Sequence, residues 1–134
     1  FLSEEFISRE ITQQIRTVDF MSTILDYLEI PFDNNYGKLD GVSLMPLIRG
    51  ISIPEQIAYS ETGNPLDKKE PPKEPNTKSV RTSKWKLILN QYDDSRELYN
   101  LELDPNEEKN LFGRGEKTEP FLWEKLEKLM KVSD

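Results

Sequence analysis

Side chains that usually carry hydrolytic or metal chemistry are largely missing from this chain. Its 134 residues contain no His and no Cys. Without histidine the chain lacks the usual general base near neutral pH and the commonest nitrogen ligand for metals. It cannot build a Ser-His-Asp triad, a thiol nucleophile or a cysteine metal site. We therefore expect the chain alone to be inactive, with no catalytic residue and no metal ligand.

The only two adjacent aspartates are Asp93 and Asp94. Carboxylate oxygens are the ligands that hard cations such as Ca²⁺ prefer. This pair, however, is followed by Ser95 and lies between two predicted strands, and Asp and Ser are common turn residues. The sequence therefore predicts a hairpin turn here rather than a metal site.

The charge balance limits the classes of partner. The chain has 18 Lys and Arg against 25 Asp and Glu, a net charge of −7, with the two signs interspersed. An acidic chain without a basic cluster is a poor partner for nucleic acid. No stretch approaches the roughly 20 apolar residues that span a bilayer. We therefore expect no nucleic-acid partner and no membrane span. The start at Phe1 rather than Met suggests processing, or a cut from a longer chain.

The first part of the chain, residues 1–56, is predicted to be helical and rich in loops. Asp19 can cap a helix over residues 19–28, and apolar residues fall on one face of that helix. A second, short helix is predicted for residues 43–49, with Ser43 as its cap. Helix 19–28 is about three turns long, too short to be stable alone in water. Its apolar face needs a partner, so we expect the isolated chain to self-associate through this region.

The second part, residues 57–134, reads as a small antiparallel sheet of about four strands packed by a C-terminal helix over residues 118–131. Residues 104–107 resemble a capping box that begins a further helix. Residues 63–78 are proline-rich and charged, which predicts a mobile loop. The fold class is therefore α+β. The predicted core consists of Trp85, Leu87, Leu89, Leu98, Leu101, Leu122, Leu126 and Leu129.

Four segments occur in the order typical of one enzyme family. The segment 17–31 reads TVDFMSTILDYLEIP, 40–50 reads DGVSLMPLIRG, 80–88 reads VRTSKWKLI, and 97–111 reads ELYNLELDPNEEKNL. Together they resemble the C-terminal region of the sulfatase family, which is part of the alkaline phosphatase-like superfamily. Ser22 stands where the family has Pro, and Asn100 where Asp is common.

The resemblance implies that the chain is the C-terminal part of an alkaline phosphatase-like α/β fold, with residues 1–56 ending the catalytic-domain region. Sulfatases hydrolyse sulfuric esters with a formylglycine nucleophile, made in a Cys/Ser-x-Pro-x-Arg motif, and a bound Ca²⁺. None of this machinery occurs here, so nucleophile and Ca²⁺ are expected in an upstream catalytic domain of the same parent. That domain, and through it a sulfate-ester substrate, are the expected partners.

The resemblance also suggests where this chain could reach the substrate. In the family, the loop after the Tyr-Ser-Glu strand and the C-terminal subdomain often form one rim of the active-site cleft. The matching rim candidates are Glu61, Thr62, Asn64, Arg81 and Lys84. The alternative is that Glu61 pairs with a neighbouring cation, and that Arg81 packs or forms a salt bridge within the sheet.

Two other functions stay open at this stage. One is the tail of a phosphonate or phosphodiester hydrolase of the same superfamily, because the tail motifs are shared. The other is a free-standing interaction module without a catalytic half. The sequence upstream of Phe1 distinguishes all three hypotheses.

Overall fold

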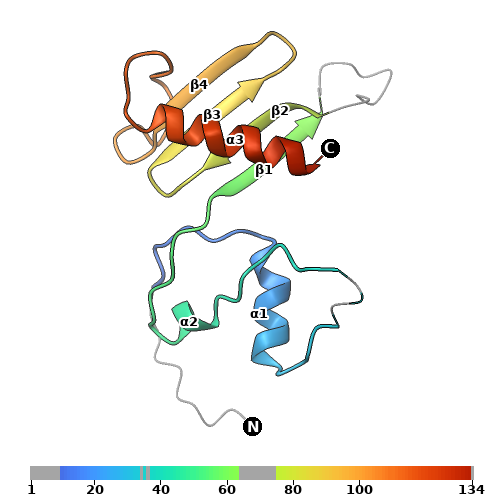
Figure 1. Cartoon of the computed structure of the whole chain (residues 1–134). Helices are drawn as coiled ribbons and strands as arrows, with labels where there is room; N and C mark the ends of the chain where they lie inside the picture. Colours follow the sequence, from blue (N-terminus) through green and yellow to red (C-terminus); the bar gives the residue numbers. More distant parts are fainter. Residues whose placement is uncertain (1–9, 34, 36, 64–74, 134) are drawn as a thin grey trace. The chain divides into compact units, whose positions relative to one another are not determined.

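The computed structural model describes residues 10–33, 35, 37–63 and 75–133. The chain forms two compact units, residues 1–56 (unit 1) and 57–134 (unit 2). Unit 1 contains the helices α1 (Asp19–Tyr27) and α2 (Met45–Ile48) (Figure 1). Unit 2 contains the strands β1 (Ala58–Gly63), β2 (Pro75–Arg81), β3 (Trp85–Asn90) and β4 (Ser95–Asn100), followed by the helix α3 (Glu119–Ser133). The predicted α+β class is confirmed.

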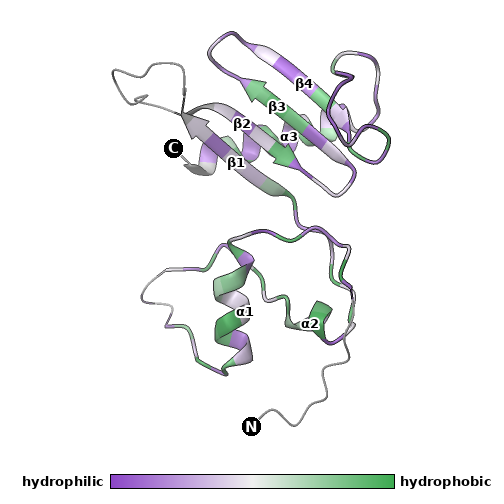
Figure 2. Ribbon diagram, turned by 180° about the vertical axis from the view of Figure 1, so that it is seen from behind, coloured by the Kyte–Doolittle hydropathy of each residue, from purple (hydrophilic) through white to green (hydrophobic). Residues whose placement is uncertain are grey.

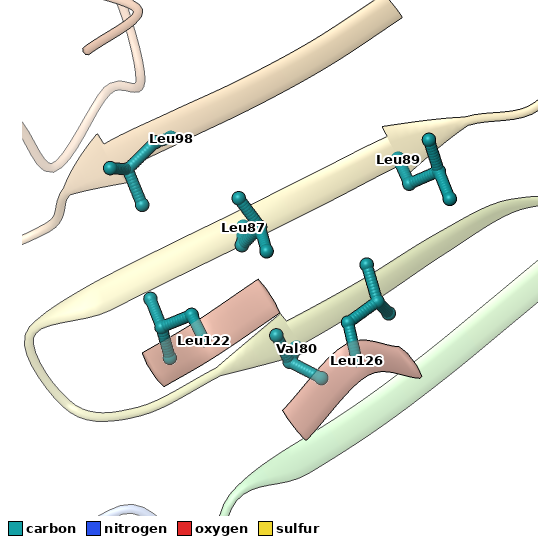
Figure 3. Close-up of a cluster of buried hydrophobic side chains, with 6 residues drawn as sticks. All are labelled: Val80, Leu87, Leu89, Leu98, Leu122 and Leu126. Atoms are coloured by element: carbon teal, nitrogen blue, oxygen red, sulfur yellow. The ribbon is translucent and has the colours of Figure 1, made fainter. Parts of the chain in front are cut away.

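The core of unit 2 lies between the sheet and α3. The strands follow the order β1-β2-β3-β4, and each neighbouring pair is antiparallel. Val80, Leu87 and Leu98 are directly opposite one another across three strands, so they share one sheet face. Figure 3 shows Leu122 and Leu126 of α3 packing on that face.

Most of the predicted core is confirmed. Leu87, Leu89, Leu98, Leu122 and Leu126 are buried in one cluster. Trp85 and Leu129 pack against it while partly exposed. Leu101 was wrongly assigned: it comes after the end of β4, where its N–H donates to the Lys84 carbonyl at 2.7 Å and begins a turn.

The loop predicted for residues 63–78 is wrong at both ends. Gly63 ends β1, and residues 75–78 belong to β2. Pro75 can begin a strand because the first position tolerates the missing N–H. The residues after it are polar, but they pair with β3, and the Thr77 hydroxyl lies 3.2 Å from the Asn90 side-chain oxygen. Residues 64–74 lie outside the described part of the chain.

The helix start predicted at residues 104–107 is also wrong. Asp104 accepts bonds from the N–H groups of Glu108 and Lys109, at 3.1 and 2.9 Å, as a capping residue would. Glu107, however, has a φ of 58°, which lies in the left-handed region and cannot continue a right-handed helix. The hydrogen bonds of Asp104 therefore close a turn and do not begin a helix.

Both helices of unit 1 lie close to their predicted places, although they are shorter. Each ends in a Schellman motif, with Glu29 in the left-handed position after α1 and Gly50 after α2. The cap of α1 differs from the prediction, because the Asp19 side chain makes no bond to the first turn. Ser43, by contrast, accepts the N–H of Met45 at 3.2 Å, at the start of α2.

The Asp19 carboxylate joins two parts of unit 1. It is fully buried and accepts two bonds from the Arg16 guanidinium, at 2.7 and 3.2 Å, and one from the Arg16 N–H at 2.9 Å. A further bond comes from the N–H of Val42 at 3.0 Å. Next to it, a Cβ on Gly41 would lie 2.0 Å from the Val18 carbonyl oxygen, so only glycine allows this close approach. Burial opposes ionisation of Asp19, but its bonds to Arg16 and Val42 lower its pKa from the ordinary 3.8.

Hydroxyl groups extend this junction along α1. Thr23 accepts the N–H of Leu44 at 3.0 Å, and Ser22 donates to the Gly41 carbonyl at 2.9 Å. Ser43 donates to the Asp26 carboxylate. The first two segments of the family pattern therefore hold each other in place, and Ser22, a departure from that pattern, contributes one of the bonds.

Truncation of the sheet core should destabilise unit 2 strongly. Leu87 and Leu126 are completely buried, so Leu87→Ala and Leu126→Ala should each lower the free energy of unfolding by about 2–5 kcal/mol. Urea unfolding followed by tryptophan fluorescence measures this, since Trp85 and Trp123 border the core. Leu103→Ala, at a highly exposed position, is the matched control. Unchanged stability in both core variants would show that the core is misassigned.

Neutralising Asp19 should loosen unit 1. Asp19→Asn keeps the shape but removes the charge that Arg16 pairs with, at a cost of about 2–4 kcal/mol. Because the folded pKa is lowered, the wild-type stabilisation is complete above the ordinary pKa and is lost as the pH falls through the folded pKa. Hydrogen exchange at the Val42 amide should be faster in Asp19→Asn at pH 7, and unchanged in the exposed control Asp33→Asn. Equal exchange in Asp19→Asn and wild type would contradict this role.

Candidate functional site

The rim candidates lie on the first two strands of the sheet and on the turn after them. Glu61 and Thr62 belong to β1, and Arg81 ends β2. Lys84 lies in the turn between β2 and β3. Asn64 lies outside the described residues.

The strand register separates Glu61 from Arg81. Arg81 is opposite Ala58, and Glu61 is three residues further along β1, roughly 10 Å away along the strand. Three residues is an odd number, so the two side chains also point to opposite faces. Glu61 lies on the α3 side with Tyr59, and Arg81 lies on the other face with Thr62. The sheet therefore does not join Glu61 and Arg81 in one ion pair.

Two of the rim candidates, Glu61 and Lys84, have interaction partners within unit 2. The Tyr59 hydroxyl donates to the Glu61 carboxylate at 2.6 Å, and Lys78 is opposite Glu61 in the register. Lys84 makes an exposed ion pair with Glu102 at 3.0 Å, which contributes little to stability. The rim role of these residues stays a prediction.

A cluster of charged and hydroxyl side chains lies on the sheet face opposite α3. Lys86 of β3 is paired directly with Tyr99 of β4. The Lys86 ammonium donates to both oxygens of Glu107, at 2.9 and 2.7 Å, and the Tyr99 hydroxyl donates to Glu97 at 2.5 Å. We call Lys86, Glu97, Tyr99 and Glu107 the outer-face cluster.

The outer-face cluster is arranged to hold a turn rather than to react. The hydrogen bond to Glu97, burial and the nearby carboxylates raise the pKa of Tyr99 to about 12, so its hydroxyl stays protonated at neutral pH. Lys86 is held in an ion pair with Glu107, which is unsuitable for a nucleophile. The cluster therefore fastens the turn after β4 onto the sheet.

The sequence reveals this cluster only in part. Along β3, Lys86 alternates with Trp85, Leu87 and Leu89, which indicates that Lys86 faces away from the core. Glu107 could not be placed with them, because its position depends on the irregular turn that begins after Asn100.

The two adjacent aspartates form a turn, as predicted. Asp93 accepts the N–H of Ser95 at 3.0 Å, and Asp94 has a φ of 54° and an ion pair with Arg96 at 3.2 Å. Among the described residues, no group of three acidic, His or Cys side chains is placed to hold a metal ion. Within that same part of the chain, no helix is long and apolar enough to cross a membrane.

Comparison with known proteins connects the chain to one family. The family model described as N-sulphoglucosamine sulphohydrolase, C-terminal, matches residues 4–133. No curated protein matches the chain.

Solved structures of similar fold include the protein BT4656 in complex with its substrate D-glucosamine-2-N,6-O-disulfate, with 27% identity and a TM-score of 0.67. That match covers 84% of this chain and 23% of BT4656. A sulfatase from Bacteroides thetaiotaomicron VPI-5482, described as putative, has 25% identity and a TM-score of 0.60, with 84% and 23% covered. A phosphonate monoester hydrolase from Silicibacter pomeroyi shares the fold at 21% identity and a TM-score of 0.54, with 85% and 24% covered. The chain thus spans about a quarter of the length of these proteins.

Proposed function

This chain belongs to the N-sulphoglucosamine sulphohydrolase C-terminal family, and from that premise we propose that it is the C-terminal part of a sulfuric ester hydrolase. The observation that carries the proposal is the family match over residues 4–133, which includes both units. The chain spans only 23% of BT4656, which supports the proposal that the catalytic residues belong to the parent's upstream part.

The proposed substrate class is a sulfated glucosamine. The family description names N-sulphoglucosamine, and the substrate bound to BT4656 is a glucosamine disulfate. At 27% identity the two chains are similar enough for this substrate class to be the first to test.

The formylglycine and the Ca²⁺ are proposed for the upstream part. The described residues of this chain do not fit a calcium site, since no three carboxylates converge. The chain also contains no Cys/Ser-x-Pro-x-Arg motif in which a formylglycine could be made. Its own residues would act on the reaction by supporting the cleft, with Thr62, Arg81 and Lys84 as rim candidates.

A cationic rim has a physical reason in such an enzyme. A sulfated sugar is anionic, so Arg81 and Lys84 would attract it, whereas the net charge of −7 opposes it elsewhere. Arg81 is exposed at the end of its strand, and Lys84 is exposed in the adjacent turn. Glu61 lies on the other sheet face and fits an anionic substrate less well.

The parent protein should release sulfate from sulfated glucosamines. Purified parent with Ca²⁺ is incubated with glucosamine N-sulfate, glucosamine 6-sulfate and a phosphonate monoester, and free sulfate or phosphonate is measured by ion chromatography. We expect kcat/KM for at least one glucosamine sulfate to exceed that for the phosphonate ester by at least about 100-fold, or about 2.7 kcal/mol of transition-state stabilisation.

The isolated 134-residue chain is the matched control and should release neither product. A preference for the phosphonate ester would refute the sulfatase assignment and favour the phosphonate hydrolase alternative. Hydrolysis by the isolated chain would refute the upstream location of the catalytic residues.

A further inference from the structure

Apolar side chains are left exposed mainly in unit 1. Of the fifteen large hydrophobic side chains that are exposed among the described residues, twelve belong to unit 1. On α1 the exposed fractions are 51% for Phe20, 57% for Met21 and 53% for Ile24, and the C-cap residue Leu28 is 54% exposed. Figure 2 shows hydrophobic stretches along α1 and α2. We call Phe20, Met21, Ile24 and Leu28 the apolar face.

A hollow next to the apolar face adds to this surface. It has a volume of about 310 Å³ and lies between the segment before α1 and the two helices of unit 1. Its apolar lining consists of Ile11, Ile15, Phe20, Leu44, Leu47 and Ile48. The volume is about twice that of the ~150 Å³ apolar cavities that hold a benzene molecule. It can therefore receive large apolar side chains from another surface.

Hydrogen bonds fix the start and the middle of α1, while its apolar face stays exposed. Asp19 fixes the start of α1 to the segment 40–42, and Thr23 fixes its middle to Leu44. These bonds fasten α1 to the segment that leads into α2. Contiguous exposed apolar surface of this kind usually marks an interaction site.

We propose that the apolar face and the adjacent hollow form the docking surface for the upstream part of the parent chain. The proposal rests on the proposed function, because the C-terminal family match and the 23% coverage of BT4656 place some three quarters of the parent outside this chain. The missing part is covalently attached and therefore present at high effective concentration. Its contacting surface must be apolar and must offer side chains that enter the hollow.

Single-cysteine labelling tests this proposal, because the chain has no cysteine of its own. Ile24→Cys places a thiol on the apolar face, and Tyr92→Cys places one at an exposed position in the turn between β3 and β4. Each variant is made in the parent and in the isolated chain, and modification of its peptide by a maleimide is followed by mass spectrometry. The isolated chain is measured at a dilution where sedimentation finds it monomeric.

We expect Ile24→Cys to react at least about tenfold more slowly in the parent than in the isolated chain, and Tyr92→Cys to react equally in both. Met21→Cys repeats the test if Ile24→Cys fails to fold. Equal rates for the apolar-face thiols in parent and isolated chain would overturn the proposal. Protection in the parent that disappears on dilution would assign the face to a second copy, and would also overturn it.

The sulfate-release assay of the wild-type parent keeps this result separate from the proposed function. An inactive parent with a protected Ile24→Cys refutes the proposed function and leaves the docking surface standing. An active parent with an unprotected thiol supports the proposed function and refutes the docking surface.

Discussion

Apolar burial is divided unequally between the two units, and this inequality determines what each can do. In unit 2 a leucine-rich sheet face and α3 enclose one another, with Leu87, Leu98 and Leu126 fully buried. Among the described residues of unit 1, only a few apolar side chains, such as those of Met45 and Leu47, are buried. Burial of apolar surface is the main favourable term in folding. Unit 2 therefore has a core of its own, whereas unit 1 needs an additional apolar surface to complete one.

Polar contacts hold the segments of unit 1 together. The Asp19 carboxylate, with Arg16 and the Val42 N–H, joins the start of α1 to the segment that leads into α2. In unit 2 the ion pair of Lys86 and Glu107 also joins two distant segments, because it links β3 to the turn after β4. The four segments that identify the family thus contact one another in pairs. These contacts give several of their residues a structural role.

Regular features of the fold could be predicted from the sequence. Periodicity located α1, α3 and the strand β3, and alternation assigned Leu87 and Leu89 to the core. Features that depend on long-range pairing could not be predicted. The polar residues 75–78 are a strand because β3 is beside them. Asp19 is a buried junction because Val42 approaches it from 23 positions away, although its sequence context is that of a helix cap.

The candidate site was predictable to a smaller extent. The resemblance pointed to Glu61 and Arg81 together, but the face on which each lies follows from the register of β1 against β2. The outer-face cluster depends on the left-handed backbone at Glu107, for which a non-glycine residue gives no signal. Sequence patterns thus located the elements, and the pairing of those elements decided which side chains meet.

The central claim is that this chain completes a larger sulfuric ester hydrolase. Sequencing the gene upstream of the codon for Phe1 tests it most directly. We predict one continuous reading frame roughly three times as long as this chain, in keeping with its 23% coverage of BT4656, with a Cys/Ser-x-Pro-x-Arg motif within it. An upstream frame with a threonine nucleophile and no such motif, or a start codon directly before Phe1, would contradict the claim.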